Sequence, residues 1–272
     1  MKIQALLVVL LTTIIFAQVP NFFDSLSSSQ KSTLASVVTN YTPLFSQDQR
    51  LSQLAKPPAS RTSKGYRLYN FVAWNIMKGA TSEQALVELQ KRDSLFALVV
   101  PHKDTILSAP TTALAGDSAS PILISFYMTS GCPACKRAGV PLYELATGPL
   151  VGRIAIAMKP IRNTDGDKAL LAANEQGRMW DLFMGYAESG AHLDRLTVME
   201  IAERQKLDVS RLMGITNRNE KEYIEILAAN RAEGRAHGLR FTPTLFFNGI
   251  RYMSNRHPLW IIDYVELLEQ QW

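Results

Sequence analysis

The segment Cys132-Pro133-Ala134-Cys135 constrains this chain most, because it contains the only two cysteines among 272 residues. An apolar run, Ile122 to Met128, leads into it, and a helical pattern follows it. With no other cysteine available, the pattern argues against a framework of several disulfides. The sulfur chemistry is concentrated where a strand gives way to a helix, which is typical of a thiol–disulfide exchanger.

The sequence gives less support to other uses of a C-x-x-C pair. A zinc site needs about four ligands, whereas there is no second cysteine pair and the four histidines are scattered singly. Covalent haem requires a histidine directly after the second cysteine, and that position is Lys136. A purely structural disulfide would close too small a loop to add much stability. We therefore expect no metal and no organic cofactor.

Residues 1–19 have the pattern of a signal peptide. Lys2 supplies a positive charge, Ala5 to Phe16 is apolar apart from two threonines, and Ala17 is a small residue at a suitable cleavage point. The apolar stretch is short for a membrane span, and an uncleaved membrane anchor is the alternative. Export would place the cysteine pair in the periplasm or another oxidising, extracytoplasmic compartment.

The charge of the chain does not indicate a nucleic-acid partner. The net charge is +5, and basic and acidic residues are interspersed without a long run of either sign. Such a pattern is typical of a mildly basic, solvated surface.

Residues 20–110 are predicted to form a helical N-terminal region. Apolar spacings indicate one amphipathic helix within 21–60, and an aromatic-rich stretch over 66–77 predicts a buried helix. Thr81 and Gln84 form a candidate capping box that opens a further helix. Prolines and Gly116 predict a linker over 101–116, and hence a domain boundary near residue 110.

Residues 111–272 read as an α/β domain. The run 122–127, a helix over 135–146 and a strand over 153–157 predict a βαβ unit. Three further helices are expected over 168–189, 197–206 and 220–237. A strand at 244–247 and the pair Asn248-Gly249 then predict a hairpin. The closing helix, 258–268, is expected to bury one apolar face.

The two cysteines are expected to have different roles. Cys132 falls at the start of a helix, where unpaired N–H groups and the helix dipole stabilise a thiolate, so it is the candidate nucleophile. Pro133 suits the first helical turn because its missing N–H costs nothing there. Cys135, one turn later, is expected to be more buried and to resolve the mixed disulfide.

A second candidate element is Thr242-Pro243, directly before a strand. Proline cannot donate to a strand ladder and belongs at a strand start. A trans turn proline is the commoner case. If the bond is cis, the backbone of Thr242 faces an incoming chain, and an extended substrate could pair with it.

With these residues in view, the chain resembles the DsbA family of thioredoxin-fold disulfide oxidoreductases. Four segments carry the resemblance: 121–136, 171–180, 201–212 and 232–249. It implies a thioredoxin fold with a helical insertion at about 164–236, and a cis Pro243 lying against the cysteine pair. It also implies exported client proteins with cysteines and a membrane redox partner that resets the pair.

The chain departs from the family pattern at three places. Ala134 replaces the histidine of the most oxidising members, so the pair is expected to be less oxidising. The strand below the cysteines carries Ser125 to Tyr127, with no carboxylate to take a proton from Cys135. Arg240-Phe241 precedes Thr242, where the family has glycine, and this puts a bulky ring near the site.

The sequence thus predicts an enzyme, an exported thiol:disulfide oxidoreductase. Two alternatives remain: an oligomeric isomerase or reductase of the same fold, and a docking protein without catalysis. Residues 20–110 are interpreted as a clamp on the same domain, as an oligomerisation arm that would make a homo-oligomer, or as a region that docks to a larger assembly. The clients and the direction of electron flow are not determined by the sequence.

Overall fold

The computed structural model describes residues 19–46, 48–55, 60–98, 114–190 and 193–271. Most of the predicted signal peptide therefore lies outside the described residues, as does the predicted boundary near residue 110. Among the helices of the described residues, none is both long and apolar enough to cross a membrane.

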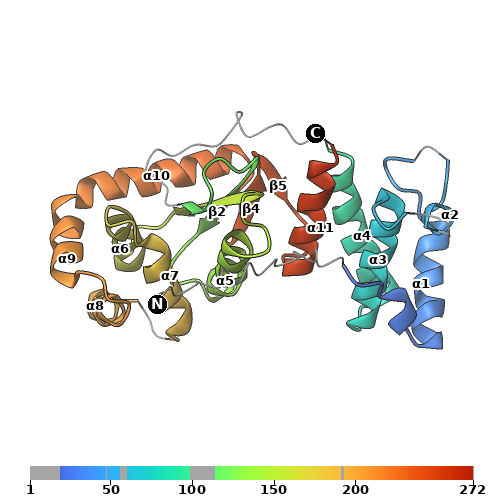
Figure 1. The fold of residues 1–272 in the computed structure, drawn as a ribbon, viewed down its shortest axis with the longest axis horizontal. Coiled ribbons are helices and arrows are strands. Elements are labelled where there is room, and N and C mark those ends of the chain that lie inside the picture. The colour runs from blue at the N-terminus through green and yellow to red at the C-terminus, as the bar shows by residue number, and fades with distance from the viewer. Residues whose placement is uncertain (1–18, 47, 56–59, 99–113, 191–192, 272) are drawn as a thin grey trace, which may run out of the picture.

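The N-terminal region is helical (Figure 1). It contains a 3-10 turn at Phe23–Ser25 and the helices α1 (Ser28–Asn40), α2 (Leu51–Leu54), α3 (Lys64–Met77) and α4 (Ser82–Phe96). The predicted capping box at the start of α4 is confirmed. The Gln84 N–H donates to Thr81 Oγ1 over 3.3 Å, and the Thr81 N–H donates to Gln84 Oε1 over 3.0 Å.

The rest of the chain folds around a five-stranded sheet with the order β1-β3-β2-β4-β5. The strands are β1 (Leu114–Gly116), β2 (Ile122–Met128), β3 (Ile154–Pro160), β4 (Thr244–Phe247) and β5 (Ile250–Tyr252). β2 and β3 are parallel, and every other neighbouring pair is antiparallel. Helix α5 (Pro133–Thr147) connects β2 to β3, so the predicted βαβ unit is confirmed.

Strand β1 was not expected, because its residues fall in the predicted linker. It pairs with β3 and places Ala115 opposite Ile156. Gly116 has a φ of +85°, and a Cβ there would lie 2.6 Å from the Ile154 carbonyl oxygen. A strand of three residues is too short to show an alternating pattern, so the sequence around Gly116 predicts a linker instead.

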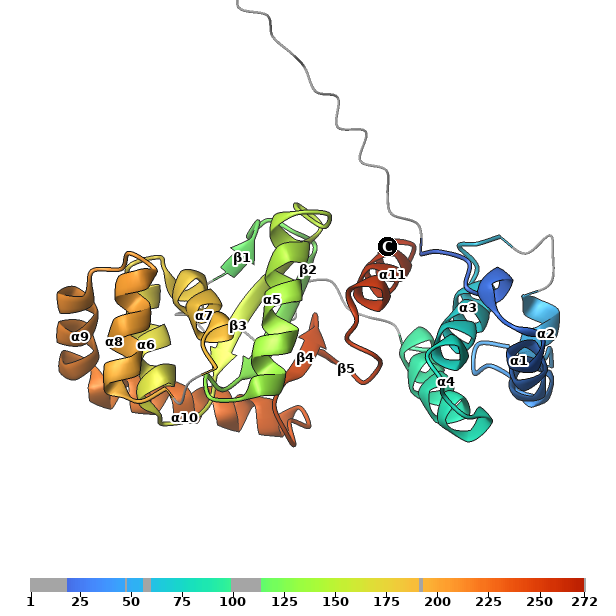
Figure 2. The same cartoon turned by 90° about the horizontal axis from the view of Figure 1, so that it is seen from below.

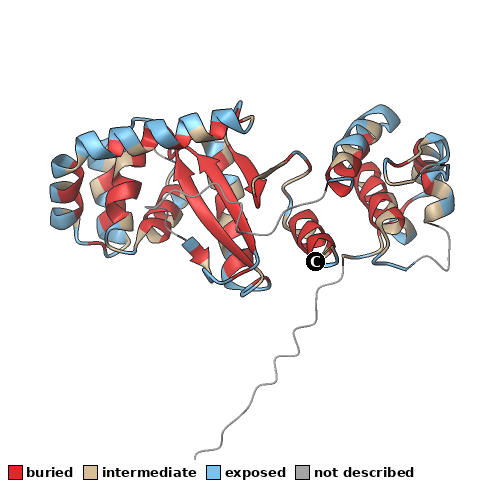
Figure 3. Cartoon of the chain, turned by 90° about the horizontal axis from the view of Figure 1, so that it is seen from above, coloured by how far each residue is buried: buried red, intermediate tan, exposed pale blue. Residues whose placement is uncertain are grey.

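Helices cover both faces of the sheet (Figures 1 and 2). All seven residues of β2 are buried, as are all those of β3 (Figure 3). On one face, Phe126 belongs to the main hydrophobic core with residues of α5 and of α11 (Pro258–Glu269). On the other face, Tyr127 packs edge-on against Phe246 and donates to Glu233 of α10 (Glu220–Ala236) over 2.8 Å.

The helical insertion between β3 and β4 is more divided than predicted. Its helices are α6 (Asp165–Asn174), α7 (Met179–Glu188), α8 (Arg195–Arg204), α9 (Val209–Arg218) and α10. The prediction of a single helix over 168–189 is wrong, because Gly177 adopts a φ of +68° and separates α6 from α7. Lys206, with a φ of +57°, separates α8 from α9, which had no counterpart among the predicted helices.

Helix α11 is buried on more than the one face that its sequence predicts. Its buried residues are Trp260, Ile261, Ile262, Asp263, Tyr264, Val265, Leu267 and Leu268. Trp260 packs edge-on against Phe71 of α3, with ring centroids 4.9 Å apart, and Tyr264 packs against Phe247 of β4 at 5.1 Å. The helix therefore lies between the sheet and the N-terminal helices, as Figure 1 shows.

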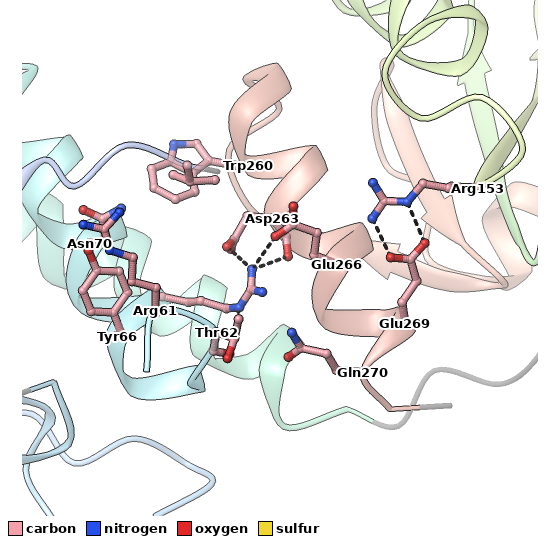
Figure 4. A pocket seen from close by; sticks show the side chains of 12 residues that line it. Arg61, Thr62, Tyr66, Asn70, Arg153, Trp260, Asp263, Glu266, Glu269 and Gln270 are labelled. Carbon is pink, nitrogen blue, oxygen red and sulfur yellow. Dashed lines mark hydrogen bonds and ion pairs between the residues drawn. The ribbon is translucent and has the colours of Figure 1, made fainter. Parts of the chain in front are cut away.

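A buried carboxylate ties α11 to two N-terminal helices. Asp263 accepts hydrogen bonds from Arg67 of α3 and from Arg92 of α4, the latter over 2.5 Å. Arg92 is fully buried and also donates to the Tyr252 hydroxyl over 2.9 Å. Glu266, which Figure 4 shows beside Asp263, accepts from the same Arg67 over 3.3 Å. The N-terminal helices α3 and α4 thus pack against α11 of the same chain. Their role as an oligomerisation arm stays a prediction.

Replacing Asp263 by alanine should destabilise the fold strongly. Arg92 would remain fully buried without a carboxylate, and Arg67 would keep only Glu266. Removing one partner of a buried pair lowers the free energy of unfolding by about 3–5 kcal/mol. Urea denaturation measures the difference.

The matched control is Glu269→Ala on the same helix. Glu269 pairs with Arg153 over 2.5 Å, but their side chains are 34% and 19% exposed, so a loss of at most about 1 kcal/mol is expected. Equal losses in the two variants would show that the Asp263 cluster does not hold the N-terminal helices in place.

Candidate functional site

The candidate site lies at one edge of the sheet, where the ends of three strands meet. β2 and β3 are parallel and end together, and the antiparallel register pairs Tyr127, near the end of β2, with Thr244, at the start of β4. The segment after β2 therefore lies beside the segment before β4. The first contains Cys132, and the second contains Thr242 and Pro243.

Cys132 occupies the N-cap position of α5. Its backbone is extended, with φ −89° and ψ 113°, and its Sγ accepts a hydrogen bond from the Cys135 N–H over 3.3 Å. Pro133 follows as the first helical residue. A sulfur at this position receives an N–H that has no partner within the helix, as a serine or aspartate would at an ordinary N-cap.

The second element lies opposite the sulfur. The Thr242–Pro243 peptide bond is cis, as the resemblance implied. The Cys132 thiol donates to the Thr242 carbonyl oxygen over 3.8 Å. The structure thus brings the predicted substrate-positioning residues into contact with the predicted nucleophile, although 110 positions separate them along the chain.

The environment of Cys132 favours its thiolate. Partial burial raises the pKa of Cys132, but hydrogen bonds from the side chain and backbone of Cys135 outweigh that effect. Hydrogen bonding with the Thr242 side chain and with the backbone of Ala134 acts in the same direction, so the pKa of Cys132 is lowered below that of an ordinary thiol. This sulfur is also partly exposed to solvent.

Cys135 has the opposite character. It is fully buried, and burial raises its pKa to about 12, with the nearby Cys132 acting in the same direction. Cys135 therefore keeps its proton while Cys132 is ionised. The pair therefore combines a partly exposed sulfur whose pKa is lowered with a buried sulfur whose pKa is raised.

Arg256 is a cation near the site that sequence reasoning missed. It lies between β5 and α11, far from the cysteines along the chain. Burial lowers the pKa of Arg256, and the charges of Cys135 and Cys132 act in the opposite direction, so the guanidinium is within electrostatic reach of both sulfurs. No motif surrounds this arginine, and the sequence offered no signal for it.

Asp167 is a second residue that sequence reasoning missed. It is fully buried in the first turn of α6, and burial raises its pKa. Its carboxylate accepts from the Ser130 N–H over 2.6 Å and from the Arg162 N–H over 2.9 Å. It therefore holds the segment before Cys132 against the segment after β3. The pattern Thr164-x-x-Asp167, a helix-start signature, was the signal that could have found it.

A hollow of about 360 Å³ lies between α3 and α11, away from the cysteines (Figure 4). Its charged residues include Arg67, Asp263 and Glu266, which pair with one another. It shares no lining residue with the cysteine site. Within the described residues there is also no cluster of three or more His, Cys, Asp or Glu side chains that could hold a metal ion.

Comparison with known proteins agrees with this geometry. Residues 108–261 match the thioredoxin family. A search of curated proteins found no match. Among solved structures, a thioredoxin-like oxidoreductase from Silicibacter pomeroyi is 18% identical, with a TM-score of 0.53 over 61% of this chain and 97% of that one. The thiol-disulfide exchange protein α-DsbA2 from Wolbachia pipientis is 16% identical, with a TM-score of 0.53 over 60% and 89%. The fold is thus that of DsbA-like proteins.

The lowered pKa of Cys132 predicts the pH dependence of its alkylation. Only the thiolate reacts with iodoacetamide, so a lowered pKa shifts the curve of rate against pH to lower pH. The half-maximal rate should fall below pH ~8.5, the value of a free cysteine. Mass spectrometry of the reduced protein follows the modification of each cysteine.

The Cys132→Ser variant supplies the internal comparison, because it leaves Cys135 as the only thiol. That thiol should remain unreactive at pH values where Cys132 of the parent protein already reacts at its full rate. A midpoint for Cys132 at or above that of free cysteine would contradict the proposed stabilisation.

Asp167→Asn should weaken the segment that carries the site. An amide presents only one acceptor atom, so one of the N–H groups of Ser130 and Arg162 would lose its acceptor in a buried place. The expected loss in the free energy of unfolding is about 1–3 kcal/mol. The exposed neighbour Asp165, changed to asparagine, serves as the control and should lose at most about 1 kcal/mol in the same urea titration.

Proposed function

The chain belongs to the thioredoxin family, and on that premise we propose that it is an exported thiol:disulfide oxidoreductase acting on other exported proteins. One observation carries the proposal. The partly exposed Cys132 sulfur receives the Cys135 N–H at the start of α5 and faces the Thr242 carbonyl before a cis proline. A nucleophile, a resolving thiol and a backbone that can position a client are therefore adjacent.

Both cysteines are free thiols in the structure, and the exchange starts from this reduced pair. The Cys132 thiolate attacks one sulfur of a client disulfide. A bond forms between the two sulfurs, the client disulfide breaks, and its other sulfur leaves as a thiolate that takes up a proton. The product is a mixed disulfide between Cys132 and the client.

Cys135 completes the exchange. It loses its proton and attacks the Cys132 sulfur, the mixed disulfide breaks, and the second client sulfur leaves as a thiolate that takes up the proton released by Cys135. The client has then gained two electrons, and the pair has become the Cys132–Cys135 disulfide. The reverse sequence oxidises a client dithiol. We also propose a membrane-bound dithiol–disulfide partner that returns the cysteine pair to its starting redox state after each cycle.

Thr242 and Pro243 are proposed to position the client. The carbonyl of Thr242 lies 3.8 Å from the Cys132 sulfur, so a client chain beside Thr242 would have its own sulfur next to the nucleophile. Pairing with backbone groups is independent of the client's side chains. Such a contact suits an enzyme that acts on several sequences.

Two single substitutions test the division of roles. With a disulfide-bonded peptide as substrate, Cys132→Ser should reduce exchange to the background rate and form no covalent adduct, because the attacking sulfur is gone. Cys135→Ser should instead accumulate the mixed disulfide, because nothing resolves it. Non-reducing electrophoresis and mass spectrometry detect the adduct.

Substitution of Lys136 by serine is the control for this test, since Lys136 is the next residue but carries no sulfur. It should still turn the peptide over. Exchange by the Cys132→Ser variant at the rate of the parent protein would sink the proposal and favour a docking protein without catalysis.

A further inference from the structure

A basic hollow of about 460 Å³ adjoins the candidate site at Thr242. No aspartate or glutamate is among the residues that line it. Four arginines line it: Arg162, Arg231, Arg235 and Arg240. Positive charges from distant positions in the sequence therefore meet in this hollow. It lies beside Thr242, whose carbonyl oxygen faces Cys132.

The arginines come from three separate segments. Arg162 follows β3, Arg231 and Arg235 lie one turn apart near the end of α10, and Arg240 precedes the cis-proline segment. Cations near a helix C-terminus complement the helix dipole, which accounts for the pair on α10. It does not account for Arg162 or Arg240, which are not on that helix. Their convergence on one hollow requires another reason.

None of the four guanidiniums has a carboxylate within ion-pair distance anywhere in the described ranges. Two acidic side chains that lie near these segments, Glu233 and Asp167, have other partners. Glu233 of α10 accepts from Lys159 and from the Tyr127 hydroxyl, and Asp167 accepts from backbone N–H groups. Four unpaired arginines that share a hollow repel one another, and a bound anion relieves that repulsion.

The hollow and the cysteine site share Thr242. Thr242 lines it and accepts the hydrogen bond from the Cys132 thiol. Phe241, a residue that is 54% exposed, also lines it, and the Arg251 guanidinium carbon lies 5.5 Å from the centre of the Phe241 ring. A client chain that reaches Cys132 past Thr242 would therefore cross an exposed ring with positive charge on both sides.

We propose that this arginine-lined hollow is a subsite for acidic side chains of the client polypeptide, a few residues from the cysteine that reacts with Cys132. The inference rests on the proposed function and adds to it a substrate class, clients whose reactive cysteine is flanked by aspartate or glutamate. Arginine suits this role because its planar fork binds a carboxylate through two parallel hydrogen bonds. The Thr242 backbone holds any client, and the hollow selects among them.

The test compares two disulfide-bonded peptides with the full protein. They have the same length and differ only in carrying aspartate and glutamate, or asparagine and glutamine, beside one cysteine. At low ionic strength the acidic peptide should react with a kcat/KM at least about tenfold higher, within the range that electrostatic steering produces. The ratio should fall towards one as sodium chloride is added, because salt screens exposed charges.

The double variant Arg231→Glu/Arg235→Glu should remove or invert the preference. Its matched control is Arg211→Glu/Arg218→Glu on α9, which changes the net charge equally but lies outside the hollow. That control should keep the ratio of the parent protein. Arg162→Ser, in a different segment, should lower the ratio as well, and this keeps the test decisive if the α10 double variant folds poorly.

The outcomes separate the two proposals. Equal rates for the two peptides in the parent protein would overturn the subsite and leave the exchange activity standing. No reaction with either peptide would overturn the proposed function itself. Loss of the preference in the α9 control would assign it to net charge and overturn the subsite. Binding of inorganic phosphate without any preference for the acidic peptide would make the hollow a small-anion site, and would also overturn it.

Discussion

The register of the central strand β2 is the constraint on which the rest of the structure depends. Its antiparallel pairing with β4 brings the segment before Thr244 beside the segment after Met128. Its parallel pairing with β3 brings the segment that contains Arg162 to the same edge. The cysteines, the cis proline and the basic hollow therefore lie close together because of the way β2 pairs with its two neighbours. A slip of one residue would exchange the faces of Phe126 and Tyr127, which would take Phe126 out of the main core and move the Tyr127 hydroxyl away from Glu233.

The asymmetry of the cysteine pair follows from where α5 begins. Cys132 lies just outside the helix and receives an N–H, whereas Cys135 lies one turn inside and is buried. The same helix start thus lowers one pKa and leaves the other raised by burial. Ala134 supplies no charge between them. Arg256, in the connection between β5 and α11, is a cation whose pKa the charges of both cysteines raise.

Helix α11 explains why the N-terminal helices cannot be treated as a detached region. One side packs on the sheet through Tyr264 and Phe247, and the other packs on α3 through Trp260 and Phe71. Asp263 lies between them and takes both buried arginines. Such a cluster is sensitive to the loss of any one member, because the remaining charges stay buried without a counter-ion. The cysteine domain and the N-terminal helices therefore share one core.

The sequence by itself determined the elements and residues whose signals are local. These were the strand before the cysteines, Cys132 at the start of a helix, the hairpin turn at Asn248-Gly249 and the capping box of α4. Resemblance to a family added the cis bond at Pro243. Only the tertiary structure decided the breaks at Gly177 and Lys206, the burial of both sides of α11, and the roles of Asp167 and Arg256. The physical reason is that hydrophobic periodicity and caps act over one or two turns, whereas these features arise where segments distant in sequence pack together and exclude water.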